Sequence, residues 1–249
     1  MLTSVRSLLA ATALAAVFAA TPALADDSPI PGLTVSGSVT AATDYRFRGV
    51  SLDGGDPAIQ GGITITHKSG FYVGTWGSNI DDGGTGIYGE LEMDLFAGWS
   101  GEVADGWKLD GGILVYTYPT NDVGPADYWE PYASITGQFG PVAAKLGVAY
   151  AWDQDSLGGH DNFYIYNNYD VAIPNSPVTI SAHIGYTDGV LAPPLLAGTG
   201  DDSGFDWSLG GSVTVLPGLS LGGAYIGTEG PSIDGFTDDT CVATLTFAM

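Results

Sequence analysis

Charged side chains recur at every second position in several stretches of this sequence. Glu90, Glu92 and Asp94 are separated from one another by Leu91 and Met93. Residues two apart lie on one face of a β-strand, whereas a helix would distribute them around its axis. Carboxylates on one face attract cations, and rings of carboxylates favour cations in pores. Further charged residues hold the polar positions of other alternating stretches: Asp44, Arg46, Arg48, Lys108, Asp110, Glu130, Lys145, Asp170 and Asp206.

The residues that could support catalysis or metal binding do not converge in the sequence. His67, His160 and His183 are the only histidines and fall in separate segments, whereas a zinc site needs several ligands that meet. Ser181 shares a strand face with His183, but two such residues often share a face by coincidence, and a nucleophile needs a positioned base. We therefore expect no metal, no cofactor and no enzymatic activity.

The alternation of apolar and polar residues extends over almost the whole chain. Period-two patterns of this kind predict strands with one apolar and one polar face. Their lengths suit tilted strands that cross a membrane, which need about 9–11 residues, and their even number suits a closed barrel. The predicted strands are residues 33–48, 57–67, 71–81, 86–99, 106–118, 128–139, 142–153, 162–173, 178–188, 204–216, 219–227 and 239–249.

Short and long connections take turns between these segments. Lys68–Gly70, Gly140-Pro141 and Pro217-Gly218 have the composition of tight turns. A barrel with short periplasmic turns and longer outer loops has this pattern, whereas a soluble sandwich does not. The fold class predicted is therefore all-β, an antiparallel up-and-down transmembrane β-barrel of twelve strands. The long connections are residues 49–56, 82–85, 119–127, 154–161, 189–203 and 228–238.

The N-terminus predicts export. Arg6 precedes an apolar run over 8–18, and Ala23-Leu24-Ala25 has the small-x-small pattern of a cleavage site, so residues 1–25 are predicted to be a signal peptide. Residues 26–249 then form a single barrel domain in the bacterial outer membrane. Its expected partners are outer-membrane lipid and lipopolysaccharide, the barrel-assembly machinery, and small polar solutes or ions. Nucleic acid is excluded, because the chain has only six Lys and Arg against a net charge of −22.

Five stretches of the sequence resemble the TorF family of porin-like proteins. They are residues 43–51 (TDYRFRGVS), 57–62, 69–79, 90–99 and 116–119, in that order. The resemblance covers essentially the whole mature chain and implies an outer-membrane barrel, with no specified substrate and no catalytic residues. The chain departs from the usual pattern of such barrels at its end, where Met249 stands in place of a terminal aromatic residue. This departure brings into question whether the barrel inserts efficiently into the outer membrane.

The predicted strand faces lead to a functional expectation. If the charged residues at the polar positions line a pore, acids outnumber bases among them by eight to four, and the pore should prefer cations. We therefore expect a passive channel for small polar or ionic solutes. The alternative is a closed structural or adhesive barrel whose lumen is filled by side chains. A barrel of twelve strands is intermediate in size between small barrels, whose interior is filled by side chains, and large barrels, which enclose an open channel. The strand count therefore does not decide between a channel and a closed barrel.

Overall fold

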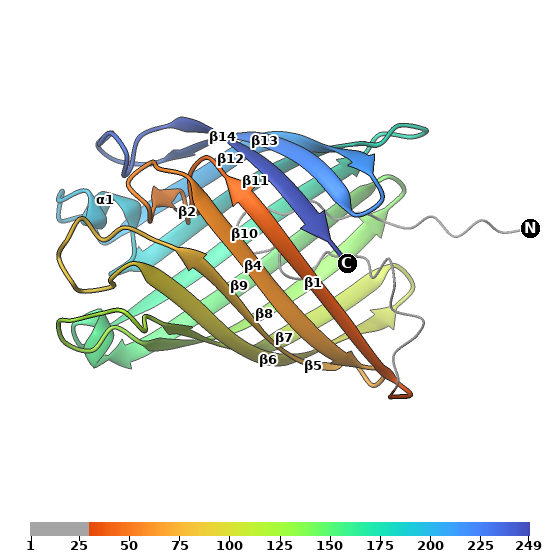
Figure 1. The fold of residues 1–249 in the computed structure, drawn as a ribbon, viewed down its shortest axis with the longest axis horizontal. Coiled ribbons are helices and arrows are strands. Elements are labelled where there is room, and N and C mark those ends of the chain that lie inside the picture. Colours follow the sequence, from red (N-terminus) through yellow and green to blue (C-terminus); the bar gives the residue numbers. More distant parts are fainter. Residues whose placement is uncertain (1–29) are drawn as a thin grey trace, which may run out of the picture.

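The protein, described by a computed structural model over residues 30–249, folds into a closed barrel of antiparallel strands. The predicted signal peptide, residues 1–25, lies outside the described residues. Each strand pairs with its neighbours in the chain, and β1 pairs with both β4 and β14, so the sheet has no open edge (Figure 1). The barrel strands are β1 (Leu33–Ala42), β4 (Ala58–His67), β5 (Phe71–Asn79), β6 (Leu91–Ala104), β7 (Trp107–Thr117), β8 (Tyr128–Phe139), β9 (Val142–Gln154), β10 (His160–Ala172), β11 (Val178–Gly189), β12 (Ser203–Leu216), β13 (Leu219–Thr228) and β14 (Thr240–Ala248).

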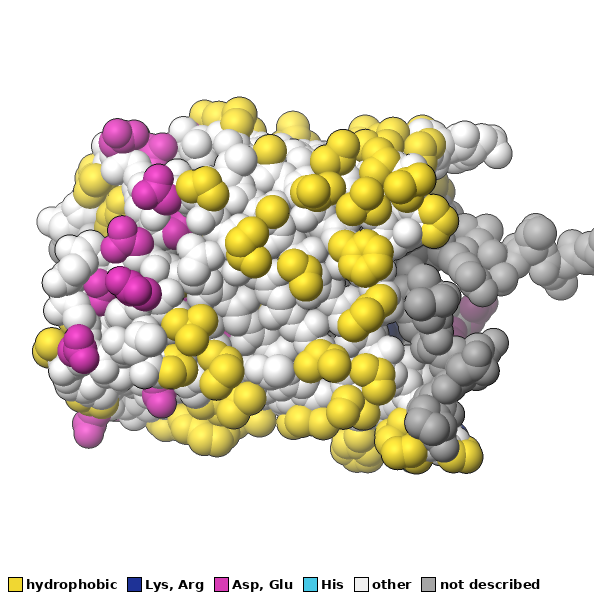
Figure 2. Space-filling view, viewed as in Figure 1, with side chains coloured by type: hydrophobic (Ala, Val, Ile, Leu, Met, Phe, Trp, Pro, Cys, Tyr) yellow, Lys and Arg dark blue, Asp and Glu magenta, His cyan; other side chains and the backbone are white. Residues whose placement is uncertain are grey.

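The outer wall of the barrel is apolar and its inner wall is polar. On β6, Leu91, Met93 and Leu95 expose 38%, 40% and 48% of their surfaces, whereas Glu92 and Asp94 between them are buried. Figure 2 shows hydrophobic side chains over the outer wall and acidic side chains gathered at the end where the long loops lie, here termed the loop end. The opposite end, with the short connections, is termed the turn end. Closure of the sheet pairs the backbone groups that an open edge would leave unsatisfied in lipid.

The predicted count of twelve barrel strands is confirmed, and most bounds agree with the prediction. β8 covers residues 128–139, as predicted. β6 begins at Leu91 and not at residue 86, because Gly86 and Gly89 adopt positive φ angles of 73° that no strand accommodates. No helix among residues 30–249 is long and apolar enough to cross a membrane, and α1 (Pro193–Leu196) has four residues.

The last strand closes the barrel through the chain's final residue. Met249 donates a backbone hydrogen bond of 3.0 Å to the Gly37 carbonyl, and its own carbonyl accepts one of 3.2 Å from Gly37. Met249 therefore extends the pairing of β14 with β1. Its effect on insertion stays a prediction.

The predicted first strand, residues 33–48, is wrong in its second half. β1 ends at Ala42, and the chain then turns into the barrel as a hairpin of β2 (Arg46–Phe47) and β3 (Val50–Ser51). We call residues 43–53 the lumen hairpin. The prediction of residues 49–56 as an outer loop is wrong for Gly49, Val50, Ser51 and Asp53, which are buried. The alternation of apolar and polar residues is the same in a strand of the barrel wall and in a hairpin that is buried on both faces, so it cannot distinguish the two.

The tip of the lumen hairpin is a tight two-residue turn. Arg48 and Gly49 have φ angles of +49° and +81°, the combination that a type I′ hairpin turn requires. A Cβ atom on Gly49 would lie 2.3 Å from Cγ2 of Thr228 and 3.1 Å from Cβ of Asp206. Glycine thus permits both the turn and the close approach of the tip to β12 and β13.

Candidate functional site within the barrel

The lumen hairpin crosses the barrel and contacts strands on different sides of it. The Tyr45 hydroxyl donates a 3.0 Å hydrogen bond to Glu92 on β6. Nη2 of Arg48 donates a 2.6 Å hydrogen bond to Glu130 on β8, and the Arg48 guanidinium lies 4.3 Å from the ring centre of Tyr164 on β10. The hairpin therefore narrows the lumen between β6 and β10 at the loop end.

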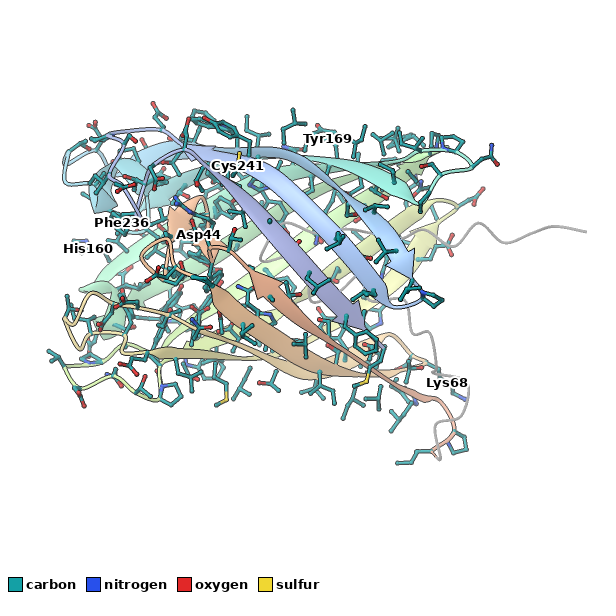
Figure 3. The ribbon with its side chains drawn as sticks, turned by 45° about the horizontal axis from the view of Figure 1, so that its top comes forward. Asp44, Lys68, His160, Tyr169, Phe236 and Cys241 are labelled. Atoms are coloured by element: carbon teal, nitrogen blue, oxygen red, sulfur yellow. The ribbon has the colours of Figure 1, made fainter. Side chains whose placement is uncertain are left out.

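Arg46 ties the hairpin to the loop between β13 and β14. Its Nε atom lies 2.5 Å from Oδ2 of Asp44, and its Nη2 atom lies 3.0 Å from Oδ1 of Asp238. Nη1 also donates to the carbonyls of Phe236 and Asp238 at 3.1 and 2.9 Å. Burial of Asp238 alone would raise its pKa, but the hydrogen bond and charge of Arg46 lower that pKa below its usual value. Figure 3 shows Asp44 and Phe236 close to each other at the loop end.

A second polar cluster joins the two arms of the hairpin. The Ser51 hydroxyl lies 2.8 Å from Asp44 and 3.0 Å from Asp53, and the backbone N–H of Tyr45 donates to Asp53 at 2.8 Å. Burial, together with the hydrogen bond and charge of Asp44, raises the pKa of Asp53 to about 6. Asp44 and Asp53 thus join the two arms of the hairpin, and the protonation of Asp53 changes near pH 6.

The wall opposite β6 carries a network around a histidine. Nε2 of His183 lies 2.8 Å from Oδ1 of Asp206 and 3.0 Å from the Tyr164 hydroxyl. The Ser181 hydroxyl donates to Asp170 at 2.6 Å. Because Ser181 contacts this carboxylate, it is not paired with His183 as a nucleophile would be with its base.

Toward the turn end, the inward-facing charged residues are more accessible. Asp110, Lys145 and Asp170 are partly exposed and Lys108 is exposed, in contrast to the buried charges around the hairpin. Asp110 accepts a 2.7 Å hydrogen bond from the Tyr72 hydroxyl. The polar lumen is therefore accessible below the hairpin and closely filled at its level.

The structure divides the predicted pore-lining residues into three groups. Asp44, Arg46 and Arg48 lie on the lumen hairpin and not on a wall strand. Glu90 is exposed in the connection before β6, so its predicted place on the inner face of a strand is wrong. The others occupy inward positions of barrel strands: Glu92, Asp94, Lys108, Asp110, Glu130, Lys145, Asp170 and Asp206.

Sequence reasoning missed the residues that hold the hairpin in place. They are Asp53, Tyr164 and Asp238, together with Trp76, which is buried against Tyr45 with ring centres 5.4 Å apart. The one local signal was Gly49 between Phe47 and Val50, since glycine readily adopts the positive φ of a tight hairpin turn; Arg48, before it, is not a residue that favours such a turn. Within residues 30–249, no group of three or more His, Cys, Asp or Glu side chains is arranged to hold a metal ion.

The comparisons with known proteins agree with the fold. Residues 26–247 match the family described as "Bacterial protein of unknown function (Gcw_chp)". No curated protein matches the sequence. The TorF resemblance is confirmed only to the extent that the structural neighbours are porins.

Three solved structures illustrate the likeness. The NanC porin has a TM-score of 0.58 at 8% identity, covering 85% of this chain and 98% of its own. The KdgM porin in complex with disordered oligogalacturonate has a TM-score of 0.53 at 7% identity, covering 86% and 95%. An outer-membrane channel from Pseudomonas putida F1 has a TM-score of 0.50 at 11% identity, covering 92% and 98%. At such identities the likeness shows a shared porin barrel fold.

Proposed function

We propose that this chain, which belongs to the Gcw_chp family of bacterial proteins, is an outer-membrane channel for small polar or ionic solutes. The observation that carries the proposal is a closed barrel with an apolar outer wall and a charged, partly accessible inner wall. A wall of this kind is stable in lipid, and a polar lumen offers solutes a path lined by hydrogen-bonding groups. In that setting outer-membrane lipid and lipopolysaccharide surround the wall, and the barrel-assembly machinery inserts it.

We further propose that the channel prefers cations. Arg46 and Arg48, the two bases at the hairpin, are both paired with carboxylates, so neither presents a free positive charge at the narrow level of the lumen. Glu92 and Asp94 face the same level without a basic partner, so acidic groups outnumber basic ones there. Local charge at a constriction outweighs the total charge of a lumen in setting selectivity.

This charge argues against acidic polymers as solutes. The KdgM porin is known in complex with oligogalacturonate, a polyanion. The present chain has a net charge of −22, and its hairpin arginines are neutralised, so it would repel such a molecule. The similarity of fold therefore does not extend to that solute class.

A closed barrel is the second candidate, and the lumen hairpin favours it. Tyr45, Arg46, Phe47, Arg48 and Val50 are all buried, so the hairpin fills much of the lumen at its level. A hairpin that is fixed there could seal the barrel and leave a purely structural or adhesive protein.

Planar-bilayer recordings separate the two candidates. Wild-type protein refolded in detergent should give discrete conductance steps, with a reversal potential in a KCl gradient that indicates K⁺ over Cl⁻. The matched variant replaces residues 44–56 by a short Gly-Ser linker, which is feasible because Ala42 and Ala58 are cross-strand partners. A silent wild type beside a conducting variant would establish the closed barrel, and an anion preference in the wild type would end the cation proposal.

A further inference from the structure

Charge pairing in the lumen leaves Glu92 and Asp94 on β6 without a cation. Arg46 is paired with Asp44 and Asp238, and Arg48 with Glu130. The other bases of residues 30–249 lie elsewhere: Lys68 in the turn after β4, Lys108 near the turn end of β7, and Lys145 at 5.8 Å from the Tyr166 ring centre.

The register of the sheet places these lysines far from the loop end of β6. Lys108 is the cross-strand partner of Glu102, which is ten residues along β6 from Glu92, or about 33 Å. No base among the described residues therefore neutralises Glu92 or Asp94.

The carboxylates of Glu92 and Asp94 are buried, and each has one oxygen atom without a hydrogen-bond partner. Glu92 is 0% exposed and Asp94 is 4% exposed. Oε1 of Glu92 accepts the hydrogen bond from Tyr45, but Oε2 of Glu92 and Oδ1 of Asp94 have no hydrogen-bond partner. The residues lie two apart on β6, about 7 Å along the strand, so their side chains point to the same, inner face of the sheet. A buried carboxylate without a partner is unfavourable and calls for a counter-ion or a proton.

A cluster of aromatic rings lies beside Glu92, which its member Tyr45 contacts. Tyr45 packs edge-on against Trp76, and Tyr88 and Tyr118 lie 4.8 Å apart between ring centres. Tyr45, Trp76 and Tyr118 belong to one buried cluster, and Tyr88 packs against it. Burial, followed by the charge of Glu92, raises the pKa of both Tyr88 and Tyr118. The faces of such rings attract cations, and ammonium groups bind well among them.

The ligand set fits an ammonium group better than a metal ion. Divalent metals take six or more oxygen ligands or several convergent side chains, and no suitable group of three acidic or histidine side chains exists within residues 30–249. An ammonium group has three N–H donors and no acceptor. Such a group therefore supplies donors, and no acceptor, to the unpartnered oxygens of Glu92 and Asp94.

We propose that Glu92 and Asp94 form a binding site in the lumen for the ammonium group of small amines. The site would give the channel a preferred solute class among cations, namely primary amines. This inference rests on the proposed channel function, but the binding itself does not require conduction.

Calorimetric titration of the refolded barrel in detergent micelles tests the binding directly. Ethylammonium chloride should bind saturably to wild type, and tetramethylammonium, which has no N–H donors, should bind at least tenfold more weakly. The variant Glu92→Gln/Asp94→Asn should lose at least tenfold in ethylammonium affinity. The control Glu102→Gln/Asp105→Asn removes the same two charges from exposed positions at the turn end and should bind as wild type does.

The outcomes of titration and conductance separate this inference from the channel proposal. Heat-modifiability on gels confirms folding, and Asp94→Asn alone replaces the double variant if the latter does not fold. Amine binding by a barrel that does not conduct would overturn the channel and leave the site standing. The binding site would be overturned if a conducting barrel showed no saturable binding of ethylammonium, or if wild type and variant bound it equally. Either result is expected if the carboxyl groups of Glu92 and Asp94 carry protons instead of binding a cation.

Discussion

Nη2 of Arg48 lies 2.6 Å from Oε1 of Glu130, and both side chains are 2% exposed, so this ion pair fixes the tip of the lumen hairpin to the wall of the barrel. The guanidinium is also stacked between two rings, with its central carbon 4.7 Å from the Phe47 ring centre and 4.3 Å from that of Tyr164. Such a position holds the cation at one place in the lumen, where Glu130 neutralises its charge.

Breaking this ion pair should destabilise the barrel. Glu130→Gln leaves a buried guanidinium without its counter-charge and should lower the free energy of unfolding by about 3–5 kcal/mol. Arg48→Met should cost a similar amount, but the double variant should cost less than the sum, with a coupling of about 1–3 kcal/mol. Urea unfolding in lipid vesicles measures all three. Strictly additive losses would show that the pair does not hold the hairpin.

Substitution of Gly49 should disturb the hairpin tip. Gly49→Ala adds a Cβ that meets Thr228 at 2.3 Å in a backbone conformation with φ of +81°, and should cost about 2–4 kcal/mol from the overlap and the left-handed conformation together. Gly124→Ala is the matched control, since Gly124 has φ of +69° but nothing within 4 Å of its Cβ position. It should cost only about 1–2 kcal/mol. Equal losses in urea unfolding would mean that the tip does not press against β13.

Protonation of Asp53 should stabilise the docked hairpin. Its pKa in the folded protein is about 6, above the usual value of 3.8, so the protonated form is favoured by folding. The stabilisation is fully present below pH 3.8 and is lost as pH rises through about 6. Asp53→Asn should therefore raise the unfolding free energy at pH 8 and change it little at pH 4. The opposite pH dependence in urea titrations would refute the buried, proton-sharing environment of Asp53.

The proposed orientation places the long loops outside the cell. Asp201 is exposed in a connection at the loop end, and Ser69 is exposed in the turn between β4 and β5. Single cysteines at these positions, in a Cys241→Ser background, can be treated with an impermeant thiol reagent on intact cells. The Asp201→Cys protein should react and the Ser69→Cys protein should not. The reverse labelling would invert the orientation.

The local sequence pattern was sufficient to determine the wall of the barrel. Leu91, Glu92, Met93 and Asp94 alternate in the sequence and alternate in exposure on β6. This works because side chains of a strand point to opposite faces with a period of two, whatever the rest of the chain does. Turn residues then mark where each strand ends, so the count of twelve followed from short-range information alone.

Only the tertiary structure decided what fills the lumen. Tyr45, Arg46, Phe47 and Arg48 alternate as a wall strand does, yet they leave the wall and enter the barrel. The counter-ion of Arg48 is Glu130, which lies 82 residues away in the sequence. Arg46 has two counter-ions, and one of them, Asp238, lies 192 residues away. These partners come within reach only once the barrel has closed. The contacts that hold the hairpin inside the barrel therefore depend on closure of the sheet, which the local alternation of side chains does not report.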